Sequence, residues 1–317
     1  MIAGVIINPS SGRNRGKGLA LAEALKPHTA VAVKVLGRFS DLVPSLQALA
    51  KSGVDVLYIS SGDGTVQAIQ TLLAEERIFA ALPRLCLIPH GTTNMNAASV
   101  GLQIKNVAAQ ADFIVRNVVS RSVEFPTLRL ANPSDGKPRH GMFLGTGALA
   151  QAVKLTQTSL NDKGVHGDLA GAVMMGSALW KYLTRAPDPT DLSRIDRPHD
   201  MTVAADGAAF CEGPQLLLLV TVLDRLMMGA RPFWGSKNAP LRLTRVAYPP
   251  PNPLRWTLPL LYGGEARRAP PGADSRAAKC IRISGPTDYA LDGEFVNVRA
   301  GEALEIETGP SFTYVQG

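Results

Sequence analysis

The sequence has few cysteines, and their spacing excludes several classes of protein. Its 317 residues include only Cys86, Cys211 and Cys280, which are odd in number and lie far apart. They form neither a disulfide framework nor a Cys-x-x-Cys metal site, so a reducing, cytoplasmic location is expected. No two of the five histidines stand at metal-ligand spacing, and no nucleophile-elbow sequence suggests a Ser/His/Asp triad.

Long apolar runs are also lacking. The longest aliphatic run is 216–220, with Val222 and Leu223 beyond Thr221, and it is too short to cross a bilayer. Residues 1–7 are apolar but have no basic leader, so we expect a short strand there rather than a secretory signal. Neither a lipidation signal nor a strongly amphipathic basic helix is evident.

Charge is modest in amount but basic in balance. Charged residues make up 19% of the chain and the net charge is +7, which favours anionic partners such as nucleotides or anionic lipid surfaces. The basic residues are scattered, without a Lys/Arg block interleaved with aromatic residues, so nucleic-acid binding is not expected. With 45% hydrophobic residues, a globular protein of about two domains is predicted.

The first part of the chain alternates strands and helices. Apolar runs of strand length fall at 2–7, 30–36, 54–60 and 85–88, and helical patterns follow them. This alternation predicts a doubly wound parallel sheet, in which the loops after the strands share one ligand-binding edge. Asn8, Asp63 and Asn94, which lie in three such loops, are therefore expected on one rim.

The stretch 54–65 organises this half. An apolar run ends at Ser60 and Ser61, enters Gly62-Asp63-Gly64, and continues as a helical pattern from Thr65. Such a strand, glycine turn and helix start can bring backbone N–H groups and the helix dipole to a phosphate. Asp-Gly is also a common turn dipeptide, so on this stretch alone an ordinary turn is an equal alternative.

The pattern changes after about residue 121. Short candidate strands separated by turn signals predict a mostly antiparallel β domain, interrupted by one helix at about 168–184. The strands are expected at 123–131, 141–149, 201–205, 215–223, 240–247, 279–284, 287–291, 294–299, 303–308 and 312–316. The proline-rich segment 248–276 is expected to be irregular. The segment 215–235 could line a lipid pocket, although an ordinary core is the commoner interpretation; its bulky side chains include Met227, Met228, Phe233 and Trp234.

Four motifs in order resemble the diacylglycerol kinase catalytic superfamily, especially soluble bacterial lipid kinases related to sphingosine and diacylglycerol kinases. Asn8-Pro9-Ser10-Ser11-Gly12 with Lys17 resembles the opening Asn-Pro-x-Ser-Gly loop. Ser61-Gly62-Asp63-Gly64-Thr65 is similar to the Gly-Gly-Asp-Gly-Thr signature, and Pro89-His90-Gly91-Thr92-Thr93-Asn94 to Pro-x-Gly-Thr-x-Asn. Leu291-Asp292-Gly293-Glu294 looks like the late Asp-Gly-Glu motif.

The resemblance implies two domains and a phosphotransferase activity. Residues 1–121 would form an α/β ATP-binding domain of phosphofructokinase/NAD-kinase type. Residues 122–317 would form an antiparallel β-sandwich substrate domain, with the last ~10–15 residues packing back on the first domain. The implied reaction transfers the γ-phosphate of ATP, with Mg2+, to a hydroxyl of a diacylglycerol-like lipid. The implied partner is a lipid at the membrane surface, which a cytoplasmic enzyme would visit transiently. The oligomeric state is not defined by the sequence.

The same resemblance assigns roles to residues. Asp63 would belong to the Mg2+–ATP network as the metal-binding residue, and Glu294 would be the general base, with Asp292 as its competitor. The alternative for 292–294 is a plain hairpin turn. The implied ATP-binding residues are Asn8, Ser10, Ser11, Gly12, Lys17, Ser61, Gly62, Asp63, Gly64, Thr65, Gly91, Thr92 and Asn94.

Three positions depart from the family pattern and keep alternatives open. The third loop usually continues Asn-Asp-Phe-Ala, whereas this chain has Met95 and Asn96, and Leu149 stands where an Asp is common after the paired glycines. The departures suggest a rearranged site, a different acceptor or reduced activity. A nucleotide- or lipid-binding regulator, or a soluble-metabolite kinase of NAD-kinase type, are therefore the alternatives to a lipid kinase.

Overall fold

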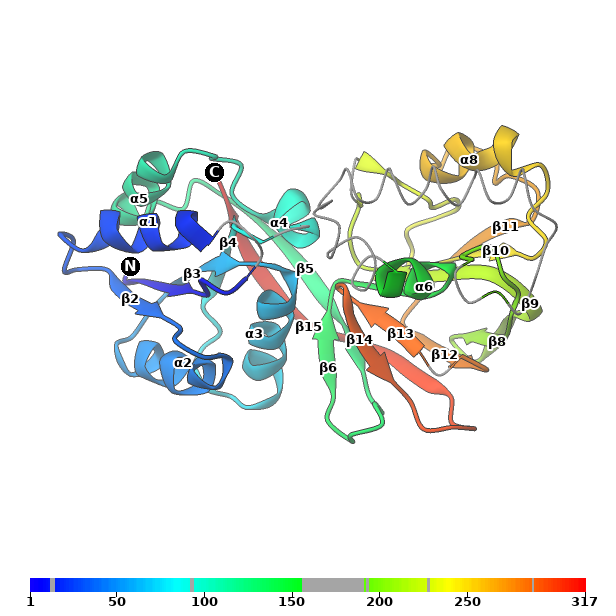
Figure 1. The fold of residues 1–317 in the computed structure, drawn as a ribbon, viewed down its shortest axis with the longest axis horizontal. Coiled ribbons are helices and arrows are strands. Elements are labelled where there is room, and N and C mark those ends of the chain that lie inside the picture. The colour runs from blue at the N-terminus through cyan, green and yellow to red at the C-terminus, as the bar shows by residue number, and fades with distance from the viewer. Residues whose placement is uncertain (12–14, 92–93, 156–190, 192–193, 227–228, 287) are drawn as a thin grey trace. The chain divides into compact units, whose positions relative to one another are not determined.

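The computed structural model describes residues 1–11, 15–91, 94–155, 191, 194–226, 229–286 and 288–317 (Figure 1). Packing divides the chain into two units, one of Met1–Thr127 with Gly309–Gly317 and one of Leu128–Thr308. Two strands, β5 (Arg121–Leu130) and β15 (Leu304–Gln316), run from one unit into the other. The assignment of these parts as an ATP-binding and a substrate domain stays a prediction.

The first unit contains a parallel sheet with the order β15-β4-β3-β1-β2. Helices α1 and α5 cover one face of this sheet, and α2 and α3 cover the other (Figure 1). The bounds are β1 Ala3–Ile7, α1 Arg15–Leu25, β2 Ala32–Val35, η1 Phe39–Asp41, α2 Leu42–Lys51, β3 Val56–Ser61, α3 Asp63–Glu75, β4 Arg84–Pro89, α4 Met95–Val100 and α5 Val107–Arg116. The doubly wound α/β fold predicted from the sequence is confirmed.

Burial on both faces explains why the strands of this sheet read as continuous apolar runs. Every residue of β1 and β3 is buried, as parallel strands covered by helices require. On the α1 and α5 side, Val5, Tyr58 and Cys86 from three neighbouring strands pack with Leu21 and Ile114 from the helices. Since the strand interiors are apolar and buried, the predicted site residues of this unit lie in the loops and helix starts that follow β1, β3 and β4.

The second unit is antiparallel and rich in strands, in agreement with the predicted fold class. Its main path is β14-β13-β7-β9-β8-β12-β15, and β10 pairs with both β9 and β11. The bounds are β6 Arg139–Gly141, β7 Phe143–Gly147, α6 Ala148–Leu155, β8 His199–Ala205, β9 Ala208–Thr221, β10 Leu241–Ala247, α8 Pro253–Leu261, β11 Ala273–Ala278, β12 Cys280–Ser284, β13 Asp288–Leu291 and β14 Glu294–Asn297.

Several elements differ from the sequence prediction. The segment expected to be irregular contains α8 and β11, and the strand expected to reach Leu149 ends at Gly147, directly before α6. The two strands predicted at 303–308 and 312–316 are a single strand, β15. β9 begins seven residues earlier than expected, at Ala208. The predicted helix at 168–184, and Met227 and Met228, lie outside the described residues.

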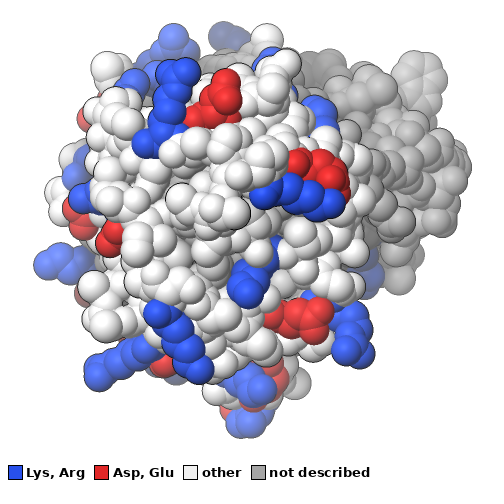
Figure 2. Space-filling view, turned by 90° about the vertical axis from the view of Figure 1, so that its left-hand side faces the viewer, with Lys and Arg blue, Asp and Glu red and all other residues white. Residues whose placement is uncertain are grey.

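The surface agrees with a scattered basic charge. In the view of Figure 2, Lys and Arg side chains stand singly among uncharged residues and acidic neighbours rather than in one block. In the part of the chain that the structure describes, no helix is both long and apolar enough for a membrane span.

Candidate functional site

The loop after β1 is tied to the loop after β3 through side-chain hydrogen bonds. Asn8 Nδ2 donates to Thr65 Oγ1 at 2.9 Å, and the backbone N–H of Asn8 donates to the Ser60 carbonyl at 3.1 Å. The Ser11 hydroxyl lies 2.8 Å from Ser61 Oγ and 3.2 Å from Thr65 Oγ1. Two predicted motifs that are about fifty residues apart in sequence are therefore joined at the carboxyl edge of the sheet.

The loop after β4 meets the same edge through a contact between two glycines. A Cβ placed on Gly91 would lie 2.3 Å from Gly62 Cα, which is closer than any side chain permits. Asn94 then closes its own loop: its Oδ1 accepts from the Gly91 N–H at 2.7 Å and its Nδ2 donates to the Gly91 carbonyl at 2.8 Å. Asn94 adopts φ +52, a left-handed conformation that asparagine tolerates better than most residues. The three loops thus converge at backbone distance.

Asp63 connects the second loop to the helix after the third. Its Oδ2 accepts from the Met95 N–H at 2.9 Å and its Oδ1 accepts from the Asn96 N–H at 3.0 Å. Both donors lie in the first turn of α4, whose N–H groups have no partner within the helix. Asp63 is 9% exposed, and burial raises its pKa above the ordinary value while the amide hydrogen bonds oppose that shift. It therefore acts as a buried cap that positions α4.

Replacing Asp63 by asparagine is expected to loosen this connection. Asparagine keeps one acceptor oxygen, but its side-chain NH2 group would replace the other oxygen and face a backbone N–H of α4, donor against donor. We therefore expect Asp63→Asn to destabilise the fold by about 1–3 kcal/mol. Urea unfolding measures the change. The control is Asp112→Asn, an exposed aspartate of α5, which should leave the midpoint unchanged. An Asp63→Asn midpoint equal to that of Asp112→Asn would contradict the capping role.

A buried histidine links the second and third loops. His90 is 4% exposed, and its Nδ1 lies 2.8 Å from Ser60 Oγ at the end of β3. Burial, followed by the positive charge of nearby Lys17, lowers the pKa of His90 below its ordinary value. Lys17 itself is exposed, on α1. The positive charge of Lys17, a predicted phosphate-binding residue, therefore acts on the third loop at His90.

His90 gives the protein a pH-dependent stability. Because the folded-state pKa lies below the ordinary value of 6.5, stability is full above pH 6.5 and is lost as pH falls toward the folded-state pKa. The loss can reach about 1.4 kcal/mol per pH unit. Unfolding midpoints at pH 7.5 and 5.5 should differ less in His90→Gln than in the exposed control His28→Gln. His199, whose pKa burial also lowers, acts equally in both variants. Equal pH dependence in the two variants would refute this role.

Of the positions that depart from the family pattern, Met95 and Asn96 are buried and Leu149 is half-buried. Met95 is 8% exposed and Asn96 is fully buried, and within the described part of the chain the side-chain amide nitrogen and oxygen of Asn96 have no hydrogen-bond partner. Leu149, in the first turn of α6, packs so closely that a Cβ on Gly145 would lie 2.8 Å from Leu149 Cβ. The sequence marks Asn96 as a departure but does not predict the burial of its side-chain amide, because that burial depends on the packing of α4.

The remaining predicted loop residues fall into three groups. Ser10 is exposed and its N–H donates to Asn8 Oδ1 at 3.0 Å. Gly64 lies in the first turn of α3, where N–H groups point out of the helix. Gly12 and Thr92 lie outside the described residues. The binding roles of all these residues stay predictions.

The late Asp-Gly-Glu motif forms the turn between β13 and β14 in the second unit. Asp292 adopts φ +49 and is 5% exposed, and its oxygens accept from the Met142 N–H at 3.1 Å and the Phe143 N–H at 2.9 Å. Glu294, at the start of β14, is exposed. The backbone of 292–294 thus forms the hairpin turn that was the alternative interpretation of this motif, and Asp292 holds the hairpin to β7. Of the two carboxylates, Glu294 has the open side chain that a general base needs.

The described donors do not fit a magnesium ion held by protein ligands alone. Mg2+ requires octahedral oxygen ligands and usually keeps several waters. Both oxygens of Asp63 already accept amide hydrogen bonds. Among the residues that the structure describes, no group of three or more His, Cys, Asp or Glu side chains could hold a metal ion.

Comparison with known proteins finds a family likeness in the first part of the chain. Residues 3–123 match the family model of the diacylglycerol kinase catalytic domain. The resemblance inferred from the motifs is thus confirmed, and this segment is similar to a diacylglycerol kinase catalytic domain. A protein of Stenotrophomonas maltophilia (strain K279a) named "Probable lipid kinase YegS-like" is 47% identical over 51 residues. That match spans 16% of this chain and 16% of the relative.

Solved structures extend the likeness in fold over the whole chain. A diacylglycerol kinase from Bacillus anthracis str. Sterne matches with a TM-score of 0.61 and 17% identity, covering 99% of this chain and 96% of that one. A second structure from the same organism matches with a TM-score of 0.62 and 19% identity, covering 99% and 97%. At this identity the similarity establishes the fold of both units.

Proposed function

We propose that the protein is a kinase that transfers the γ-phosphate of ATP to a lipid hydroxyl. The observation that carries this proposal is the hydrogen-bonded convergence of three loops at the carboxyl edge of the parallel sheet. Crevices at that edge bind ligands in α/β proteins of this type. The diacylglycerol kinase model matches the segment that contains all three loops. The relative named as a YegS-like lipid kinase supports a lipid as acceptor.

The loops supply the parts that ATP binding requires. The N-terminus of α3 offers the N–H groups of its first turn, whose partial positive charge favours a phosphate. Gly62 and Gly91 carry no side chain, so the second and third loops can lie in contact beside that N-terminus. Lys17 adds positive charge at the same edge. We assign Asn8, Ser11, Ser61 and Thr65 to hold the first two loops in this arrangement.

Two carboxylates take distinct parts in the proposed reaction. Glu294 accepts the proton of the lipid hydroxyl as the oxygen attacks the γ-phosphorus and the bond to the bridging oxygen of ADP breaks. Asp63 positions α4 and the third loop, and through them the nucleotide. Its predicted role as the metal-binding residue of the Mg2+–ATP network stays a prediction. Mg2+ bound to ATP would offset phosphate charge.

The test is transfer of labelled γ-phosphate from Mg2+–ATP to lipids in mixed micelles. The panel holds diacylglycerol, phosphatidylglycerol, sphingosine and ceramide, with NAD as a soluble acceptor. Labelling of at least one lipid is the expected result. Labelling of NAD alone would favour a soluble-metabolite kinase. If no acceptor were labelled but ATP still raised the unfolding temperature, the kinase hypothesis would be rejected in favour of a nucleotide-binding regulator.

A further inference from the structure

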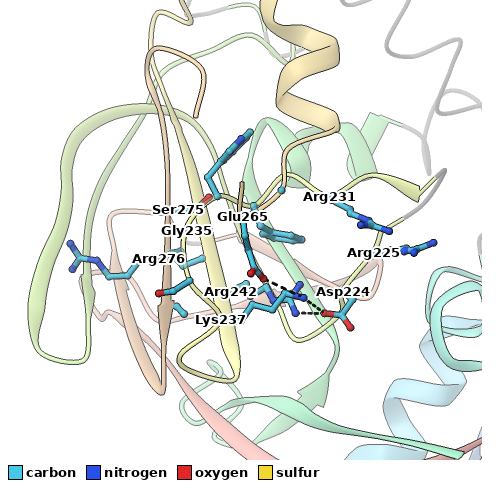
Figure 3. Close-up of a pocket in the computed structure, with 15 residues that line it drawn as sticks. Asp224, Arg225, Arg231, Gly235, Lys237, Arg242, Glu265, Ser275 and Arg276 are labelled. Atoms are coloured by element: carbon cyan, nitrogen blue, oxygen red, sulfur yellow. Dashed lines mark hydrogen bonds and ion pairs between the residues drawn. The ribbon is translucent and has the colours of Figure 1, made fainter. Parts of the chain in front are cut away.

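The second unit contains a cavity of about 320 Å³ that none of the residues predicted for ATP binding or catalysis lines. The segment after β9, strands β10 and β11, and Gly264 with Glu265 form its walls (Figure 3). Cationic side chains dominate the lining, with Phe233 and Trp234 as buried aromatic neighbours. The charged residues are Arg225, Arg231, Lys237, Arg242 and Arg276 against Asp224 and Glu265.

The cavity wall is fixed by hydrogen bonds on two sides. Thr244 Oγ1, from β10, donates to the Pro232 carbonyl at 2.7 Å. The Arg231 N–H donates to the Leu261 carbonyl at 2.7 Å, and the Gly264 N–H donates to the Phe233 carbonyl at 2.8 Å. These bonds hold the segment that carries Arg231, Phe233 and Trp234 in place. The backbone of the cavity is therefore ordered before a ligand arrives, which reduces the entropic cost of binding.

Two of the cations converge on one acid. Figure 3 shows Lys237 and Arg242 directed toward Asp224. Arg242 is held further by the Leu223 carbonyl at 3.3 Å and lies 5.5 Å from the centroid of the Phe233 ring. Lys237 Nζ lies 3.1 Å from Asp224 and 3.4 Å from Glu265, and its side chain is half exposed. Arg242 is thus fixed in the wall, whereas Lys237 stays accessible.

The charges favour an anion over a cation as ligand. Five cationic and two acidic residues line the cavity, and both acids already contact Lys237. Arg276 directs its guanidinium to the Ala209 carbonyl and the Phe210 ring, whereas Arg231, another of the five, is exposed. Exposed ion pairs such as those of Lys237 contribute little stability, so exchanging a carboxylate for a doubly charged phosphate costs little. Phosphate oxygens also form stronger, charge-assisted hydrogen bonds with such groups.

We propose that this cavity binds a phosphate ester, with Arg231 and Lys237 contacting the phosphate and Arg242 at the wall behind it. The volume lies at the lower end of the ~300–1,000 Å³ range of ligand pockets, which suits a small ester such as glycerol phosphate. The ester can belong to a soluble metabolite or to the headgroup of an anionic phospholipid. The proposal does not depend on the kinase activity, because a different set of residues carries it.

Calorimetric titration with sn-glycerol 3-phosphate and sedimentation with vesicles test the proposal. The vesicles consist of phosphatidylcholine with or without phosphatidylglycerol. Binding in either arm is expected, and both arms should weaken with added salt. Binding of the soluble ester identifies a metabolite-type site, and binding of phosphatidylglycerol vesicles alone identifies a headgroup site. Absence of binding in both arms would overturn the proposal.

Charge-neutralising variants locate the site. Arg231→Gln and Lys237→Gln are each expected to weaken binding at least about tenfold, because each removes one charge-assisted contact. Both side chains are exposed, so thermal unfolding should be unchanged. Arg282→Gln removes an exposed positive charge from β12 in the same unit, away from the cavity lining, and should bind like the unaltered protein. Undiminished binding by the Arg231→Gln/Lys237→Gln double variant would exclude this cavity as the site.

Discussion

Glu294→Gln is expected to slow γ-phosphate transfer by about 10²–10⁴-fold, the usual contribution of a general base. The substitution keeps the size of the side chain and removes only its capacity to accept a proton. Because Glu294 is exposed at the start of β14, the fold should not change. Initial rates at saturating ATP and lipid, measured beside the thermal unfolding temperature, separate these two effects.

Two further carboxylates serve as comparisons for Glu294. Glu212→Gln alters an exposed carboxylate on β9 and should retain full activity. Asp292→Asn should lower the unfolding temperature, because its oxygens accept hydrogen bonds from the Met142 and Phe143 amides. If Asp292→Asn stayed fully stable and lost activity while Glu294→Gln remained active, Asp292 and not Glu294 would be the general base.

Gly91→Ala is expected to abolish ATP binding and to destabilise the first unit by about 1–3 kcal/mol or more. The new Cβ would lie 2.3 Å from Gly62 Cα and 3.0 Å from Gly62 N, and these are backbone atoms that cannot rotate away. The second and third loops would have to separate, which would also disturb the Asn94 hydrogen bonds with Gly91. Unfolding with and without ATP measures both effects.

A matched glycine provides the control. A Cβ on Gly16, in helix α1, would have no atom of the described residues within 4 Å. Gly16→Ala should therefore leave ATP binding intact and stabilise the helix by up to about 1 kcal/mol. Normal ATP binding by Gly91→Ala would show that the close contact between Gly62 and Gly91 is not needed for the nucleotide site.

The parallel half of the fold could be predicted because its strands are buried on both faces. Such strands leave continuous apolar runs, and the polar residues that end them mark the loops. The elements of the second half were harder to predict where they contain proline, which usually indicates a loop or a turn. Helix α8 contains Pro253 in its first turn, where proline is tolerated, and Pro259 in its interior. In β15, Gly309 and Pro310 suggest a turn, yet the strand continues through them.

The site could be predicted in location but not in its internal bonds. Three glycine-containing loops after parallel strands must share an edge, so the convergence of Asn8, Asp63 and Asn94 on one unit follows from topology. The capping of α4 by Asp63 joins residues more than thirty positions apart and has no signature in sequence. The basic cavity likewise combines separate segments, since Asp224, Glu265 and Ser275 line it together with residues of 231–243.

Amide hydrogen exchange with and without Mg2+–ATP tests most directly whether the three loops bind the nucleotide. Peptides covering 8–11, 61–66 and 89–91 with 94–96 should gain protection together, and the gain should be lost in Gly91→Ala but kept in Gly16→Ala. Peptides of the second unit around β10 should change little. Protection confined to the second unit, or absent from the Gly62–Thr65 turn, would contradict ATP binding at this edge.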